Sequence, residues 1–357
     1  PLYSSAASDV YKRQGLACAV TAAWHGLKVI VVEKDSTFGG ASAWSGGWMW
    51  VPGNPLARRA GIHENPQQPR TYLKHELGER YDAARIDAFL DNGPQMVAFF
   101  EQHTALQFVD GNGIPDIHGQ VPGAGIEGHQ VIAAPYDARA IGPLLKRLRK
   151  TLRETSFLGM PIMAGADLGA FLSMTRSFRS LLHVAGRFAR HLRDLALHGR
   201  AMHLVNGVAL IGRLGKSAED LGVNLLESTP ARSLLRNSQG VQGALVDTPE
   251  GPREIRARRG VLLAAGGFAN DLPRRQALFP RAQGPDEHLA LPPRSCCGDG
   301  IRLGEQAGAV LATDLASPVA WAPVSRVRHA DGSIGHFPHI IDLSLIHISE
   351  PTRLGMI

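Results

Sequence analysis

The stretch that most constrains the fold of this chain is residues 27–47, LKVIVVEKDSTFGGASAWSGG. The apolar and β-branched residues Leu27–Val32 predict a short buried strand, and Glu33 follows at its carboxyl end. Two glycine pairs come next, Gly39-Gly40 and Gly46-Gly47, where backbone can approach a large planar ligand because no Cβ intervenes. An acidic side chain at this place in a strand–helix–strand unit accepts hydrogen bonds from the ribose of an adenine dinucleotide.

A glycine-rich turn normally opens such a unit, and this chain lacks it. In dinucleotide-binding folds a first strand and the pattern G-x-G-x-x-G place the pyrophosphate on a helix N-terminus. Residues 15–26 are typical of the helix that follows this turn, yet residues 1–14, PLYSSAASDVYKRQ, contain neither a glycine nor a strand pattern. We therefore expect the first strand and the glycine-rich turn to be missing.

The two ends of the chain offer a reason for this gap. Residues 9–14, DVYKRQ, can be encoded by DNA whose reverse complement encodes LSLIHI, which is residues 343–348. We interpret residues 1–14 and 343–357 as translated transposase-adapter DNA from library preparation and exclude them from the fold, as a processing segment would be excluded. The native part is then an internal fragment, 15–342, and the presence of a signal peptide ahead of it is left open.

Composition favours a soluble α/β enzyme. The chain is 44% hydrophobic with 40 glycines, and no run of about 18 uncharged apolar residues predicts a membrane span. Cys18 is expected to be a small buried residue, and the adjacent Cys296 and Cys297 are poorly placed to pair with each other. With only three cysteines no disulfide framework is indicated, which favours a reducing, cytoplasmic setting.

The formal charge is +6, and much of it lies in residues 176–213. Solvated helix faces are the favoured interpretation, while a helix that docks on a membrane surface or a partner is the alternative. Nucleic-acid binding is not indicated, because neither a fold motif nor interleaved aromatic residues accompany the charge. No pair of histidines has the spacing of metal ligands, so no metal is expected.

Two later motifs continue the pattern. Val261–Ala265 predicts a second buried strand, and Gly266-Gly267 provides a close backbone approach at its end. Cys297-Gly-Asp-Gly300 places Asp299 at a predicted helix N-terminus, where its carboxylate can cap free N–H groups.

The order of these motifs resembles the flavoprotein family of fumarate reductase, the succinate dehydrogenase flavoprotein and the 3-ketosteroid Δ1-dehydrogenases. The resemblance implies an α/β fold with a glutathione-reductase-like FAD-binding Rossmann domain and an inserted α+β substrate lobe. It also implies FAD as cofactor. The residues that it assigns to FAD are Glu33, Lys34, Gly39, Gly40, Ala41, Ser42, Ser45, Gly46, Gly47, Ala231, Ala265, Gly266, Gly267 and Asp299.

Within this family the ketosteroid-dehydrogenase branch fits best, on residues 50–54 (WVPGN), 87–93 (DAFLDNG), 115–116 (PD) and 321–325 (WAPVS). The covalent flavoproteins of the family carry a histidine before the second glycine pair, and residues 39–45 contain none, so we expect non-covalent FAD. Soluble fumarate reductases have a His-Pro contact where this chain has Trp321-Ala-Pro, which does not favour a fumarate or succinate substrate.

The chain divides into four predicted blocks. Residues 15–54 and 201–270 form the FAD domain, 55–200 form a mostly helical insertion, and 271–342 begin a substrate lobe. The predicted helices are 83–103, 141–153, 171–197 and 205–221, and the predicted strands of the third block are 223–226, 234–235, 241–246 and 253–255.

The expected chemistry is oxidation or reduction of a CH–CH bond beside a carbonyl of a small hydrophobic, steroid-like ketone, with a quinone or another electron acceptor. His118 and, behind it, Tyr136 are the candidate base or oxyanion donor, although a loop histidine is more often bonded to backbone or solvent, as for His129, His336 and His339. The Trp44, Trp48 and Trp50 cluster is equally consistent with core packing and with flavin lining. Two alternatives stay open: a reductase of a small unsaturated acid fed by a haem or quinone partner, and a flavoprotein remnant without activity.

Overall fold

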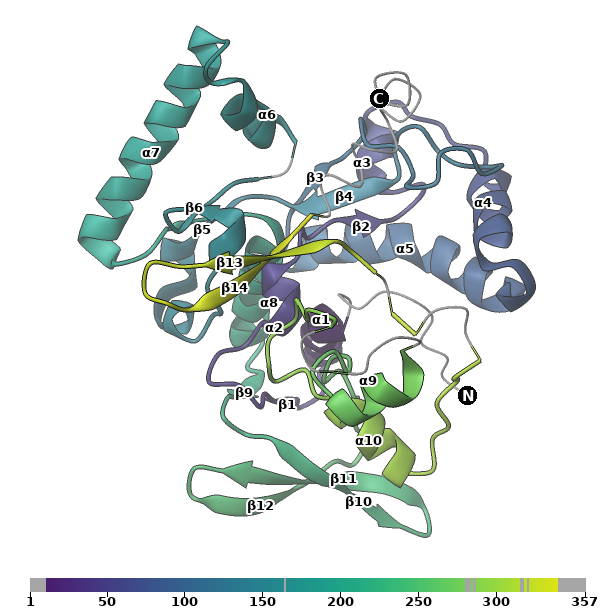
Figure 1. Ribbon diagram of the computed structural model, residues 1–357. Helices are drawn as coiled ribbons and strands as arrows, with labels where there is room; N and C mark the ends of the chain where they lie inside the picture. The colour runs from purple at the N-terminus through teal and green to yellow at the C-terminus, as the bar shows by residue number, and fades with distance from the viewer. Residues whose placement is uncertain are drawn as a thin grey trace.

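The computed structural model describes residues 11–163, 165–279, 284, 287–314, 318–319 and 321–339. Figure 1 shows a helix-rich body with small sheets around it. The helices are α1 (Tyr11–Trp24), α2 (Gly40–Trp44), α3 (Pro55–Arg59), α4 (Gln67–Leu77), α5 (Ala83–His103), α6 (Ala166–Ser173), α7 (Phe178–His198), α8 (Asn206–Asp220), α9 (Leu272–Leu278) and α10 (Asp299–Gln306), with 3₁₀ turns η1 (Gly78–Arg80), η2 (Ala138–Lys146) and η3 (Arg153–Thr155).

The strands are short and form several separate sheets. They are β1 (Ile30–Val32), β2 (Met49–Trp50), β3 (Phe108–Asp110), β4 (Gln130–Ala133), β5 (Tyr136–Asp137), β6 (Ser156–Phe157), β7 (Met160–Pro161), β8 (His203–Leu204), β9 (Asn224–Leu226), β10 (Ala231–Asn237), β11 (Gly240–Thr248), β12 (Gly251–Arg256), β13 (Val324–Arg328) and β14 (Ile334–Pro338). Strand β1 pairs in parallel with β9, and the antiparallel groups are β10-β11-β12, β2-β4-β3, β5-β8, β6-β7 and β13-β14.

Helix α8 lies at the centre of the core. It packs on α1, α2, η2 and β4, and eleven of its fifteen residues are buried. Glycines make this crowding feasible: a Cβ added at Gly215 would lie 2.8 Å from the Phe38 ring, and one added at Gly212 would lie 3.0 Å from Ile141. The apolar side chains Leu210, Ile211 and Leu214 fill the spaces that remain.

Most predicted elements of the core are confirmed. Helix α5 has the predicted bounds and buries Leu90, Val97 and Phe100 on one stripe, and α8 and β9–β12 lie where the pattern placed them. Residues 141–153 are not an α-helix, however. Gly142 has φ 63° and Pro143 follows it, so the 3₁₀ segment η2 is kinked there and ends at Lys146.

The predicted helix 171–197 is two helices. Helix α6 ends at Ser173, and α7 starts after Ser177, whose side chain accepts a hydrogen bond from the Ser180 N–H. The prediction for Cys18 was also wrong, since this residue lies on the exposed side of α1. No described helix is long and apolar enough to cross a bilayer.

The two strands predicted beside the dinucleotide are less regular and more exposed than expected. Strand β1 covers only Ile30–Val32, and Ile30 is 48% exposed. Residues Val261–Ala265 form no strand, and Leu262 is 59% exposed. A strand needs a neighbour to take up its backbone hydrogen bonds, and among the described residues no strand pairs with this segment. The Rossmann subtype and the domain boundaries therefore stay predictions.

Candidate functional site

The acidic residue after β1 is fixed by backbone hydrogen bonds on both sides. Its N–H donates to Leu226 O at 2.7 Å, and its carbonyl oxygen accepts from Thr229 N at 2.8 Å. The Glu33 carboxylate is half-buried, and Oε1 accepts from Asp35 N at 3.0 Å. The side chain is therefore held at the carboxyl end of the strand, as the sequence predicted.

Segments far apart in the sequence meet at this strand end. Lys34 Nζ lies 2.8 Å from Asp299 Oδ2, and Ser295 Oγ donates to Asp35 Oδ2 at 2.6 Å. The N–H of Gly298 donates to Gly267 O at 3.0 Å. Parts of the predicted motifs at 27–47, 261–267 and 297–300 thus meet, together with Ser295 just ahead of the third. Residues 33–35, 265–267 and 295–299 form one site, which we call the strand-end site.

Asp299 supplies charge to this site and does not cap its helix. The residue before α10 is Gly298, with φ 71°, and Asp299 is the first residue of the helix. Burial raises the pKa of the Asp299 carboxyl, but hydrogen bonds and charge from Lys34 and Arg302 outweigh it and hold the pKa below its usual range. Burial lowers the pKa of Lys34, and its bond to Asp299 more than offsets this.

The two glycine pairs lie at opposite ends of α2, and part of each pair is required by protein packing. A Cβ at Gly47, where φ is 76°, would lie 2.7 Å from the carbonyl carbon of Asn206, and one at Gly39 would lie 3.1 Å from Ile211. Conversely, a Cβ at Gly207 would lie 1.9 Å from Ser42 O. Gly207 was not predicted to belong to this region, and its only signal in the sequence is a glycine at the start of a predicted buried helix.

The remaining predicted cofactor residues are spread along the same elements. Gly40 and Ser42 are buried in α2, Ala41 is half-buried there, and Gly46 is exposed after it. Ser45 Oγ donates to Ser42 O at 2.8 Å and accepts from Gly47 N at 3.2 Å, which tightens the turn between α2 and β2. Ala231 opens β10, two residues after the Thr229 N–H that contacts Glu33.

Neither catalytic candidate contacts the strand-end site within the described residues. The His118 side chain is 53% exposed, and Nδ1 lies 2.7 Å from Glu76 Oε2. Tyr136, in β5, packs its ring 4.3 Å from the Arg213 guanidinium, and burial raises the pKa of its hydroxyl although Arg213 opposes this. Both roles stay predictions.

A buried ionic cluster in the β2-β4-β3 region was not expected. The prediction that His129 bonds only backbone or solvent was wrong: its Nδ1 lies 2.9 Å from Asp116 Oδ1, and its Nε2 contacts the Glu64 carboxylate. Trp50 Nε1 donates to Asp116 Oδ1 at 2.7 Å. Burial lowers the pKa of His129, but the two carboxylates raise it to about 9, so the ring is a cation at neutral pH.

Each tryptophan of the 44–50 cluster contacts other parts of the protein. Trp50 stacks on Phe89 with 6.0 Å between ring centroids, and Trp48 fills the space above Gly111. Trp44 Nε1 donates to Lys150 O at 3.0 Å. All three side chains are only half-buried, so core packing and flavin lining both stay predictions.

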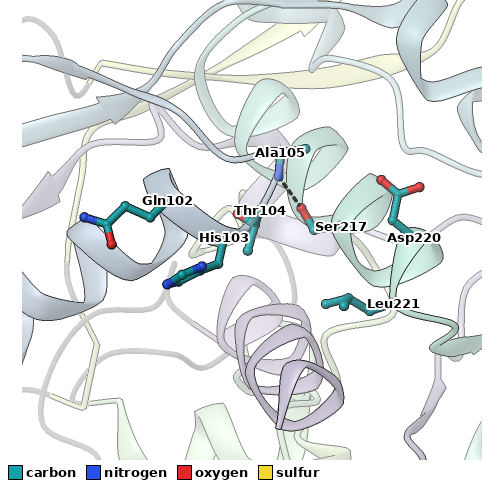
Figure 2. A pocket seen from close by; sticks show the side chains of 7 residues that line it. All are labelled: Gln102, His103, Thr104, Ala105, Ser217, Asp220 and Leu221. Carbon is teal, nitrogen blue, oxygen red and sulfur yellow. Dashed lines mark hydrogen bonds between the residues drawn. The ribbon is translucent and has the colours of Figure 1, made fainter. Parts of the chain in front are cut away.

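A separate hollow of about 250 Å³ lies between the end of α5 and the end of α8 (Figure 2). His103, Asp220 and Leu221 line it, and Ser217 Oγ accepts a hydrogen bond from Ala105 N at 3.0 Å. None of the residues predicted to bind FAD lines this hollow, so it carries no argument for the cofactor site.

The chain matches the family described as FAD binding domain over residues 15–345. This chain belongs to that family. It is 34% identical over 341 residues to 4-oxocyclohex-2-ene-1-carboxylate 5-dehydrogenase of Sinomonas cyclohexanicum, covering 96% of this chain and 57% of that protein. It is 32% identical over 315 residues to 3-oxosteroid 1-dehydrogenase of Mycobacterium tuberculosis, covering 87% and 54%. The chain thus spans about half the length of these curated relatives.

Solved structures of this flavoprotein family have the same fold. The 3-ketosteroid Δ1-dehydrogenase of Sterolibacterium denitrificans superposes with a TM-score of 0.79 at 27% identity, over 90% of this chain and 57% of that one. A flavocytochrome c3 fumarate reductase superposes with a TM-score of 0.51 at 16% identity, over 89% and 41%, which shows the fold alone. The predicted FAD-binding flavoprotein family and its fold are confirmed.

The described residues of this family member fit FAD at the strand-end site. Glu33 offers a half-buried acceptor at the end of β1. Gly267 and Gly46 have open space beside them, unlike Gly39 and Gly47. A Cβ at Gly267 would meet no described atom within 4 Å, and one at Gly46 would lie 3.6 Å from Trp48. Open space beside a glycine is where a ligand can approach backbone.

Proposed function

We propose that this chain is the FAD-binding part of a dehydrogenase that acts on a CH–CH bond beside the carbonyl of a hydrophobic cyclic ketone. The observation that carries the proposal is the meeting of residues 33–35, 265–267 and 295–299 at the end of β1. The substrate class is supported by the names of the relatives, which are dehydrogenases of a 4-oxocyclohexene carboxylate and of 3-oxosteroids.

The bound flavin would supply the redox step by accepting a hydride. Glu33 would accept hydrogen bonds from the ribose, and the open space at Gly46 and Gly267 would let the cofactor approach the backbone. The raised pKa of Tyr136 keeps its hydroxyl protonated at neutral pH, which suits a hydrogen-bond donor to a carbonyl oxygen. His118, whose Nδ1 contacts Glu76, would take a proton from the carbon next to the carbonyl.

The binding of FAD would be non-covalent, because no histidine lies in residues 39–45. An acid-reductase function is less well supported, since Trp321 lies where a soluble fumarate reductase carries its His-Pro contact. Trp321 packs 5.0 Å from Phe279 and from His288, ring centroid to ring centroid, and is 48% exposed. This aromatic surface suits an apolar substrate better than a dicarboxylate.

Replacing Glu33 with glutamine in the full-length protein is expected to weaken FAD affinity by about 10- to 100-fold, because a hydrogen bond to a charged group contributes about 1.5–3 kcal/mol. The measurement is flavin fluorescence titration of the apoprotein. Glu250→Gln is the matched control, since the Glu250 carboxylate accepts a hydrogen bond from Thr248 at the β11–β12 turn, away from the strand-end site. Equal affinity in the Glu33 variant and the parent would remove the ribose role.

The full-length protein is expected to purify with bound flavin. A cyclic ketone such as 4-oxocyclohexanecarboxylate or a 3-oxosteroid is expected to reduce this flavin under anaerobic conditions, seen as loss of its absorbance, whereas succinate is not. Bleaching by succinate alone would contradict the ketone assignment and favour the acid reductase. The 357-residue chain itself is expected to bind FAD weakly and to show no turnover, and recovery of this chain with stoichiometric flavin would contradict that expectation.

A further inference from the structure

Helix α7 is amphipathic in the reverse of the usual sense. The side that packs on the protein is polar: Arg187, His191 and Asp194 are its buried residues, each at most 8% exposed. The opposite side is apolar and faces solvent, with Phe178 75%, Leu182 57% and Leu192 48% exposed. In a helix of a globular protein the apolar stripe normally faces the core.

The polar side fixes the rotation of α7. The guanidinium of Arg187 donates to Asp167 at 2.8 Å and to Pro161 O at 2.9 Å. His191 Nε2 lies 3.0 Å from Leu158 O, and Asp194 accepts from Arg139 at 2.8 Å. Because these buried bonds would be lost if the helix turned over, the apolar side is held outward.

The outward side is a continuous stripe that extends onto α6. Its members recur at helical spacing at positions 178, 182, 185, 189, 192 and 196, which are Phe, Leu, Ala, Ala, Leu and Ala. Leu172 of α6, 71% exposed, adds to it, and α6 packs on α7. The two helices project from the body of the protein (Figure 1). We call this surface the α6–α7 face.

Arginines border the stripe, and carboxylates are almost absent from it. Residues 166–200 contain six arginines and two carboxylates, Asp167 and Asp194, whose side chains are only 10% and 8% exposed and are paired with Arg187 and Arg139. Arg179, Arg190 and Arg193 are exposed, and on a helical projection all three lie beside the apolar stripe on the same flank.

A cationic cavity of about 250 Å³ opens beneath this flank. Its charged lining consists of four arginines, two carboxylates and His191, namely Arg139, Arg187, Arg190, Arg193, Asp137, Asp194 and His191. The Nδ1 atom of His191 is buried and has no hydrogen-bond partner among the described residues. A buried polar atom without a partner is uncommon in a folded protein, and here it borders a cavity in which four guanidinium groups outnumber two carboxylates. The cavity therefore suits an anionic oxygen ligand such as a phosphate.

We propose that the α6–α7 face rests on an anionic phospholipid surface. Phe178, Leu182 and Leu192 enter the boundary between headgroups and acyl chains, while the flanking arginines contact lipid phosphates. A second copy of the chain is a poorer occupant, because an antiparallel two-fold contact through α7 would bring the arginine flanks of the two copies together. This inference does not depend on the proposed reaction.

The test is flotation of the 357-residue chain with phosphatidylcholine vesicles that contain or lack phosphatidylglycerol. The chain is expected to float with the anionic vesicles and to be released by high salt. The double variants Leu182→Ser/Leu192→Ser and Arg179→Gln/Arg190→Gln are each expected to lower the partition coefficient at least about tenfold. Their melting temperatures are expected to stay at the parent value, because all four side chains are exposed.

Matched controls come from other exposed positions. Val310→Ser, at a residue 93% exposed, and Arg253→Gln, in β12, are expected to leave binding unchanged. Binding that is equal with neutral and anionic vesicles, or lost equally in the controls, would overturn the proposal. Self-association without lipid that Leu182→Ser abolishes, with no flotation of the parent, would assign the face to a second copy and also overturn it.

Discussion

Replacing Gly207 with alanine is expected to destabilise the chain by about 3 kcal/mol or more, because the crossing of α2 and α8 has no room for a methyl group. The new Cβ would lie 1.9 Å from Ser42 O and 2.9 Å from Ser45 O, and both are backbone atoms that cannot rotate away. The measurement is the midpoint of chemical unfolding followed by circular dichroism.

The matched control is Gly186→Ala, in the exposed middle of α7. A Cβ at Gly186 meets nothing within 4 Å, and alanine is the better helix former, so this change is expected to stabilise the chain by about 0.5–1 kcal/mol. If Gly207→Ala unfolds at the same denaturant concentration as the parent, the close crossing of α2 and α8 is not the packing of the protein in solution.

Replacing His129 with leucine is expected to cost about 3–5 kcal/mol, since it leaves the carboxylates of Asp116 and Glu64 buried without their cation. Asp116 also anchors its own loop, because its Oδ2 accepts from Gly125 N at 2.8 Å. His118→Leu, at a histidine that is largely exposed, is the control and is expected to change stability by less than about 1 kcal/mol.

The same cluster gives stability a defined pH dependence. The folded pKa of His129, about 9, lies above its ordinary value of 6.5, so the folded state binds the proton more tightly than the unfolded chain. The stabilisation is fully present below pH 6.5, is lost progressively as pH rises through 9, and amounts to about 3 kcal/mol. Burial raises the pKa of the Asp116 carboxyl, but the bond to His129 outweighs burial, so the pKa lies below its ordinary value. The stabilisation that Asp116 contributes is therefore present at neutral pH and is lost as the pH falls through the lowered pKa.

Unfolding midpoints of the parent and of His129→Leu, measured across this range, check the linkage. The unfolding midpoint of the parent is expected to fall between pH 6.5 and 9, and that of the variant is expected to stay constant over this range. An equal alkaline loss in both proteins would place the titrating group elsewhere.

Local pattern was sufficient for much of the fold and of the site. Helix α5 could be predicted with its bounds because its apolar residues recur at helical spacing and Asp82 caps its start, both of which are local in sequence. Glu33 could be predicted from its place at the end of a strand, whereas Gly266-Gly267 and Asp299 were assigned to the same site through the resemblance of the motif order to the flavoprotein family. The break between α6 and α7 could not be predicted, because the apolar residues before and after it keep the same helical spacing.

The sequence by itself determined the family, the order of the motifs and the apolar character of Val261–Ala265. Only the tertiary structure decided whether that segment pairs, because a strand depends on a neighbour that local pattern does not contain. It also decided that Gly47 and Gly207 serve the crossing of α2 and α8, and that His129 lies between two carboxylates from distant segments. Such contacts join residues far apart in the chain, and their energies arise from burial, which a sequence pattern does not specify.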